Sequence, residues 1–309
     1  MLVTFPLMLA LFLDPSRQTL IEQGRVPVPP PMPRRAIAPP ATLPAGSYRL
    51  LADGTVRYTL FLPYGYRVPQ DGSVRLTVHF HTAPWFVIEE HLRRGLSEPL
   101  AIFALGEGSN TYRLPFEDPD RFDRILRQIE RSLGPCSLGQ PPRVNQVDIT
   151  SFSAGYGAVR ELVKQPRYVQ LIRRIILADS LYAGWDPAST QPGATSRPAA
   201  ENIDPWRGFV ELAARGEKTF VLTHSMVPTR YASTHACAQA LIEMIDAPVV
   251  EVRRGEIPAT LDPDYPLLYR ADLGRFHVWG YDGTDAGAHM THARHLADVW
   301  QALDACEDR

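Results

Sequence analysis

The chain has 309 residues, of which 45% are hydrophobic, so it can bury a sizeable core and lies near the upper size of a single domain. Its 32 basic and 34 acidic residues are well mixed and give a formal net charge of −2. The sequence therefore has no basic patch that would indicate a nucleic-acid partner, and no acidic tail that would indicate a charged partner. We expect a small-molecule substrate, and the oligomeric state stays open.

An apolar segment, Met1 to Leu13, opens the chain. It is long enough for the hydrophobic region of a signal peptide and too short to span a bilayer comfortably, but it lacks a basic start and a small-x-small cleavage site. Localisation stays open: the segment is either a signal for export, with a slight lean to the periplasm, or an N-terminal docking helix of a cytoplasmic protein. We expect residues 1–24 to form this signal or anchor, residues 25–46 to be a proline-rich linker, and residues 47–309 to form one domain.

Three cysteines, Cys136, Cys237 and Cys306, show no C-x-x-C spacing. Neither a disulfide framework nor a zinc knuckle is indicated, and the disulfide state stays open.

From residue 47 onward, strand-like runs alternate with helix-like runs. We expect strands at 48–51, 56–62, 74–80, 100–105, 147–152, 172–178, 219–223 and 275–279, and helices at 86–94, 121–133, 158–164, 206–214, 234–245 and 288–303. The opening strands suggest antiparallel pairing, whereas the later alternation predicts a mostly parallel sheet with helices on both faces. Ligands of such a sheet bind outside the carboxyl ends of its strands, so the residues that follow each strand are the candidates for a site.

A small-x-Ser-x-Gly pattern, Ser151 to Gly155, lies between an expected strand and an expected helix. A serine at such a sharp turn, here Ser153, presents its Oγ to a cleft. The next backbone N–H, that of Ala154, then faces negative charge that develops there. The five-residue pattern is common by chance, but its flanking strand and helix favour a nucleophile.

Two further residues complete the chemistry at the strand ends. Asp179 follows the strand expected at 172–178, and His289 follows the one expected at 275–279. A serine hydroxyl becomes a good nucleophile when an imidazole accepts its proton, and that imidazole needs a carboxylate to fix its tautomer. The order Ser153, Asp179, His289 therefore predicts a catalytic triad.

With the turn around Ser153, the Ser-Asp-His order and the alternation of strands and helices, the chain resembles the α/β-hydrolases. More closely, the segments 152–160, 106–109 and 280–283, together with His289, resemble a group of little-characterised bacterial hydrolases of this fold. The resemblance implies an α/β-hydrolase fold, with a mostly parallel central sheet flanked by helices on both faces. It also implies an oxyanion hole made by Ala154 and an amide of the loop after strand 74–80, for which Thr82 and Ala83 are the candidates.

The acid has alternatives. In many proteins of this fold it follows the strand that we expect at 219–223, where this chain has no carboxylate. This departure favours Asp179, and Asp282 and Asp285 remain because they flank the histidine loop.

The base has alternatives as well. His292 and His295 follow His289 on the same expected helix, while His224 ends one strand and His277 lies inside another. A base in the loop or first helical turn reaches the serine best, which favours His289.

We expect the substrate to meet side chains from several loops: His81, Ser109, Asn110, Tyr112, Tyr156 and Tyr182. Residues 106–110 carry no phosphate-binding pattern and are interpreted as a flexible pocket wall. Residues 182–204, rich in Pro, Gly, Ala and Ser, are interpreted as a short lid that suits a small substrate.

These residues lead to the hypothesis of a serine hydrolase that cleaves a carboxylic ester, or an amide, through an acyl-enzyme and without a cofactor or metal. A peptidase is a variant of the same chemistry. One alternative is a metal-dependent hydrolase built on His79, His81, Asp285, His289 and His292, although no H-E-x-x-H or comparable spacing is present. Another is a non-catalytic binding protein that keeps the hydrolase fold.

Overall fold

The computed structural model describes residues 42–190, 196–252 and 262–307. The segment expected at 1–24 and most of the linker expected at 25–46 lie outside the described residues, as does the middle of the expected lid at 182–204.

Ten strands within the described residues form one sheet, in the order β1-β2-β4-β3-β5-β6-β7-β10-β9-β8. The strands are β1 Gly46–Asp53, β2 Val56–Pro63, β3 Ser73–Phe80, β4 Leu100–Phe103, β5 Arg143–Phe152, β6 Ile172–Ala178, β7 Thr219–His224, β8 Val249–Glu251, β9 Leu267–Leu273 and β10 Phe276–Tyr281. Neighbours from β4 to β10 pair in parallel, and the pairs at both edges are antiparallel. The prediction of a mostly parallel sheet is confirmed.

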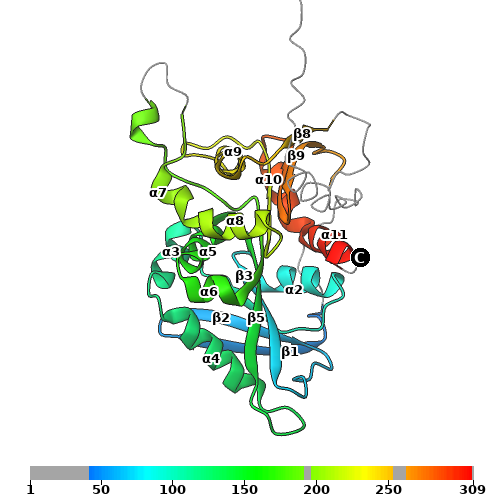
Figure 1. Cartoon of the computed structure of the whole chain (residues 1–309). Coiled ribbons are helices and arrows are strands. Elements are labelled where there is room, and N and C mark those ends of the chain that lie inside the picture. The colour runs from blue at the N-terminus through cyan, green and yellow to red at the C-terminus, as the bar shows by residue number, and fades with distance from the viewer. Residues whose placement is uncertain (1–41, 191–195, 253–261, 308–309) are drawn as a thin grey trace, which may run out of the picture.

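Helices cover both faces of this sheet, as Figure 1 shows. The apolar side chains of α3, α4, α5, α6, α8 and α9 join one core cluster, and those of α2, α10 and α11 join the clusters on the opposite face. The helices are α2 Pro84–Arg93, α3 Ser109–Phe116, α4 Arg121–Leu133, α5 Tyr156–Val163, α6 Pro166–Leu171, α7 Ala200–Ile203, α8 Arg207–Ala214, α9 Thr234–Ile245, α10 Ala286–Arg294 and α11 Leu296–Glu307.

The patterns in the sequence explain these elements. In α4 the buried side chains are Phe122, Ile125, Leu126 and Ile129, which share one face at helical spacing. In β5 the last residues are all buried, as expected for a strand with helices on both faces. Val147 and Ile149 join one core, and Phe152 joins the other, because successive side chains of a strand alternate.

The expectations about elements were wrong at one helix and incomplete elsewhere. The helix expected at 288–303 is two helices, α10 and α11, because the backbone leaves helical geometry at His295, whose Nδ1 hydrogen-bonds with Asp298 Oδ2 at 2.8 Å. Strands β8 and β9 and helices α3, α6 and α7 were not expected. Strand β9 pairs with β10 along its length, so its place is decided by a neighbour rather than by its own pattern.

No helix among the described residues combines the length and the apolar character that crossing a bilayer requires. Cys136 and Cys237 are both buried free thiols.

Candidate active site

Ser153 lies where β5 ends, in a short 3-10 turn, Ser153–Gly155, that leads into α5. Its φ of 49° is in the left-handed region, which costs energy for a residue with a side chain. A Cβ on Gly155 would lie 2.3 Å from the carbonyl oxygen of Phe80 in β3, so only glycine lets the turn pass that strand. Ser180 Oγ donates a hydrogen bond to the Ser153 carbonyl at 2.8 Å and anchors the turn from the end of β6.

Asp179 is the first residue after β6, and it also has a positive φ, 42°. Its N–H donates to the Thr223 carbonyl of β7 at 2.8 Å. Its buried Oδ2 accepts hydrogen bonds from His289 Nδ1 at 2.8 Å and from Ser225 Oγ at 2.6 Å. Burial alone raises the pKa of Asp179, but the hydrogen bonds from His289 and Ser225 and the nearby imidazoles outweigh it and lower the pKa to about 2.

His289 lies in the first turn of α10, and 22% of its side chain is exposed. Its ring stacks on that of Phe152, with centroids 4.5 Å apart and an interplanar angle of 28°. Because Phe152 directly precedes Ser153, the imidazole lies beside the turn that carries the serine. With the Nδ1 proton donated to Asp179, Nε2 is left as the nitrogen that can accept a proton.

The alternative acids have other partners. Asp282 Oδ1 accepts from the Gly283 N–H at 2.7 Å. Asp285 caps α10 by accepting from the Ala288 N–H at 2.8 Å, and it also accepts from the Tyr265 hydroxyl at 2.9 Å. The structure therefore brings Asp179, and neither of these two, to His289.

The other candidate histidines are engaged elsewhere. His292 is buried, and its Nδ1 hydrogen-bonds with Thr223 Oγ1 at 2.8 Å. His224 is held between the Ser225 carbonyl and the Tyr269 hydroxyl. His277 pairs with Asp272 inside the core.

The loop after β3 carries the residues expected to complete the oxyanion hole. His81 and Thr82 have φ values of 73° and 98°, and Ala83 is the residue before α2. Buried His79 holds this loop, because its Nδ1 hydrogen-bonds with Thr150 Oγ1 at 2.7 Å and its Nε2 with the His81 carbonyl. The His81 ring stacks on Phe152 with centroids 6.0 Å apart, so the loop lies against the serine turn.

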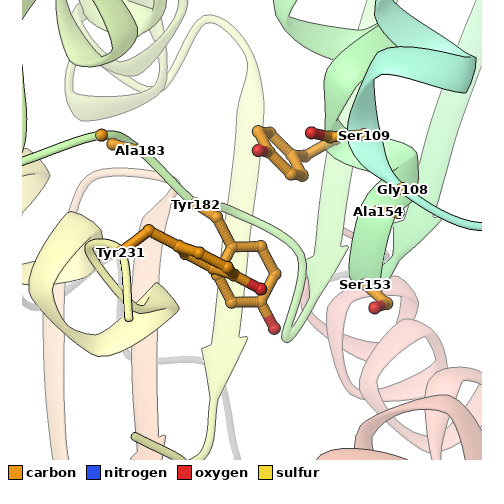
Figure 2. Close-up of a pocket in the computed structure, with 9 residues that line it drawn as sticks. Gly108, Ser109, Ser153, Ala154, Tyr182, Ala183 and Tyr231 are labelled. Carbon is orange, nitrogen blue, oxygen red and sulfur yellow. The ribbon is translucent and has the colours of Figure 1, made fainter. Parts of the chain in front are cut away.

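A pocket of about 440 Å³ opens beside Ser153 (Figure 2). Figure 2 shows Tyr182 and Tyr231 on one side and Ser109 and Ser153 on the other. None of the lining residues carries a charge: they are Gly108, Ser109, Ser153, Ala154, Tyr156, Tyr182, Ala183, Gly184 and Tyr231. Of the expected substrate contacts, Ser109, Tyr156 and Tyr182 line the pocket, whereas His81, Asn110 and Tyr112 do not.

Of the wall expected at 106–110, Gly108 and Ser109 line the pocket, and the segment leads into helix α3, which begins at Ser109. This helix packs closely on α5, since a Cβ on Gly157 would lie 2.4 Å from the Ser109 carbonyl oxygen. Tyr112 is fully buried, and its hydroxyl donates to the Gly106 carbonyl at 3.0 Å and accepts from the Leu105 N–H at 3.1 Å. Tyr112 therefore stabilises the β4–α3 turn, contrary to the expectation that it contacts substrate.

Sequence reasoning missed Tyr231, whose side chain is large, 50% exposed and at the pocket. It lies between β7 and α9, in a loop that follows the carboxyl end of a parallel strand. That position was the available signal, because such loops converge in space. Ser225 lies in the same loop, in the segment after 219–223 where the chain has no carboxylate.

The ligand set of the metal-dependent alternative is not assembled. Among the residues that the structure describes, no three His, Cys, Asp or Glu side chains converge as a metal site requires. His79 uses both ring nitrogens within the protein, and Asp285 caps a helix.

Comparison with known proteins supports the fold. No family model matches the chain, and no curated protein matches it. Among solved structures, it is similar to a serine-to-alanine mutant of the feruloyl esterase module from Clostridium thermocellum in complex with sinapinate, at 12% identity, over 90% of this chain and 95% of that one, with a TM-score of 0.50. A structure designated FAE is similar at 11% identity, over 90% and 95% of the two chains, with a TM-score of 0.51.

The chain has the α/β-hydrolase fold. At identities this low, the likeness to these structures concerns the fold alone, and the chemistry must be argued from the side chains of this chain.

Proposed function

We propose that the protein is a serine hydrolase that cleaves a carboxylic ester, or an amide, through an acyl-enzyme. One observation carries the proposal: His289 is hydrogen-bonded to buried Asp179 at 2.8 Å and stacked on Phe152, the residue before Ser153. A nucleophile, a base and an orienting carboxylate are the parts that acyl transfer needs.

In this mechanism Ser153 Oγ attacks the substrate carbonyl carbon while His289 Nε2 takes the hydroxyl proton. The N–H of Ala154 and an amide of the Thr82–Ala83 loop stabilise the negative oxygen of the tetrahedral intermediate. His289 then returns the proton to the leaving alcohol, and the acyl-enzyme remains on Ser153. Water, activated by the same imidazole, hydrolyses it, and Asp179 stays ionised throughout.

The pocket supports a neutral substrate of modest size. The rings of Tyr156 and Tyr182 are 5.6 Å apart, and those of Tyr182 and Tyr231 are 5.4 Å apart, so the three form one aromatic wall. Such a wall favours a flat or apolar group, and no lining side chain neutralises an anion. The volume of about 440 Å³ suits a short acyl group better than a long chain.

The test is labelling by a fluorophosphonate probe combined with hydrolysis of neutral nitrophenyl esters of increasing chain length. We expect the wild-type protein to label at Ser153 and to prefer short esters, and Ser153→Ala to lose both labelling and hydrolysis with an unchanged circular dichroism spectrum. Undiminished labelling of the variant would exclude Ser153 as the nucleophile. A folded wild-type protein that does not label would favour the non-catalytic alternative.

A further inference from the structure

Ser225 is the first residue after β7, and it is 2% exposed. Its hydroxyl donates to Asp179 Oδ2 at 2.6 Å, a shorter contact than the 2.8 Å from His289 Nδ1 to the same oxygen. One carboxylate oxygen thus accepts from both the candidate base and a serine on the neighbouring strand end. Ser225 also lies in the segment after β7, where the resemblance to the α/β-hydrolases implies the acid and where this chain has no carboxylate.

The contacts around Ser225 fix the direction of its hydroxyl. The Val227 N–H donates to Ser225 Oγ at 3.4 Å, which leaves the hydroxyl proton for Asp179. The Met226 N–H donates to the Gly283 carbonyl at 3.0 Å and ties this loop to the one that precedes α10. The β7 loop therefore links the loop of the acid to the loop of the base.

Several titratable groups face Asp179 from the elements packed around it. His289 and His292 approach from α10, and buried His224 approaches from β7. Tyr182, in the segment after β6, donates its hydroxyl to the Asp179 backbone carbonyl at 3.2 Å. Of these groups, His289 donates to the carboxylate itself. Ser225, which does not titrate, donates to the same carboxylate oxygen.

We propose that Ser225 is a positioning residue of the Ser153–His289–Asp179 system: its hydroxyl holds the Asp179 carboxylate in the orientation that receives His289 Nδ1. The inference rests on the proposed function. The last torsion of an aspartate side chain has only a broad, roughly two-fold preference, so one donor from a partly exposed histidine restrains the carboxylate weakly. The buried hydroxyl adds a second, fixed donor on the same oxygen and also draws charge from it.

The consequence for catalysis has two parts. Without the hydroxyl, the carboxylate rotates more, and His289 is aligned with Ser153 for less of the time. The carboxylate also keeps more of its charge, which favours the protonated imidazole, so the acidic limb of the pH profile moves to higher pH. If the Ser225 side chain only filled space, its removal would lower the activity by impairing folding. It would leave the acidic limb of the pH profile unchanged.

The experiment compares Ser225→Ala with Ser225→Thr, which keeps the hydroxyl. We expect Ser225→Ala to lower kcat about 10-fold with KM nearly unchanged, which corresponds to the loss of one hydrogen bond to a charged group. We also expect the acidic limb of kcat/KM to move to higher pH. Ser225→Thr should restore most of the rate. Ser132→Ala is the matched control, because it removes a serine hydroxyl bonded to the Ile129 carbonyl on remote helix α4.

A readout that needs no turnover separates this inference from the proposed function. The Nδ1 proton of His289, held by a carboxylate, should give a downfield proton resonance in the wild-type protein that shifts or broadens in Ser225→Ala. An unchanged resonance together with an unchanged kcat and acidic limb would overturn the role of Ser225. Absence of probe labelling at Ser153 in the wild-type protein would instead overturn the proposed function.

Discussion

Backbone strain is concentrated at the candidate site. Among the described residues, five non-glycine residues have a positive φ: His81, Thr82, Ser153, Asp179 and Asp246. The first four follow β3, β5 and β6 and surround the proposed reaction centre. Such conformations cost of order 1–3 kcal/mol each, so their grouping at three neighbouring strand ends supports a functional role for these residues.

The lowered pKa of the Asp179 carboxyl leads to a prediction about how the stability of the fold depends on pH. Its pKa in the folded protein, about 2, lies below the ordinary value of 3.8. The charged form therefore stabilises the fold above about pH 4, and this contribution is lost as the pH falls toward 2. A shift of this size corresponds to about 2 kcal/mol.

We expect the difference in unfolding free energy between the wild-type protein and Asp179→Asn to change by about 2 kcal/mol between pH 5 and pH 2, with the wild type losing more. Urea unfolding at a series of pH values, followed by tryptophan fluorescence, measures it. The comparison is needed because other carboxylates titrate in the same range. A difference that stays constant with pH would contradict the assignment.

At the level of elements, the serine turn depends on a close approach between β3 and the start of α5. The φ of Gly155 is −62°, so its importance comes from space and not from backbone freedom. An added Cβ would lie 2.3 Å from the Phe80 carbonyl oxygen, and the obstacle is backbone that cannot turn aside. This approach brings the loop after β3 to the turn that carries Ser153.

We expect Gly155→Ala to push α5 from β3, to destabilise the protein by about 2 kcal/mol and to abolish most probe labelling. Gly208→Ala is the matched control, because Gly208 lies in α8 and a Cβ there meets nothing within 4 Å. That change should be neutral or stabilise by up to about 1 kcal/mol through helix propensity. Equal urea midpoints for the two variants would show that the packing at Gly155 is not restrictive.

At the scale of the whole molecule, the C-terminal helix α11 closes the sheet face opposite α5. Asp304 accepts from Arg94 Nε at 3.0 Å and from Arg174 Nη1 at 2.8 Å, and the Arg174 side chain is fully buried. The Arg94 guanidinium lies 3.4 Å from the centroid of the Trp300 ring. Because α11 directly follows α10, this anchor also supports the helix that carries His289.

We expect Asp304→Asn to destabilise the protein by about 3 kcal/mol, since it leaves buried guanidinium groups without that carboxylate. Asp204→Asn is the control: its ion pair with Arg207, at 3.3 Å, joins two exposed side chains, and its loss should cost less than about 0.5 kcal/mol. Thermal or urea unfolding measures both. Similar costs for the two variants would contradict an anchoring role for Asp304.

Local sequence was sufficient for much of the fold. The alternation of strands and helices, the amphipathic α4 and the strand-to-helix turn at Ser153 all follow from periodicity and residue size over a few neighbours. Those patterns predicted the parallel sheet, and the sheet predicted that residues after its strands would meet. The elements that were missed, such as β9 and α3, depend on partners elsewhere in the chain.

The sequence by itself determined the fold class and placed Ser153, Asp179 and His289 after the carboxyl ends of strands in the sheet. Only the tertiary structure decided that Asp179, and neither Asp282 nor Asp285, meets His289, because that choice depends on which strand ends are neighbours. The same reason explains why the contact of Ser225 with Asp179 and the place of Tyr231 at the pocket were not predicted. Their contacts join loops far apart in the sequence, and no local pattern records which loops the strand order brings together.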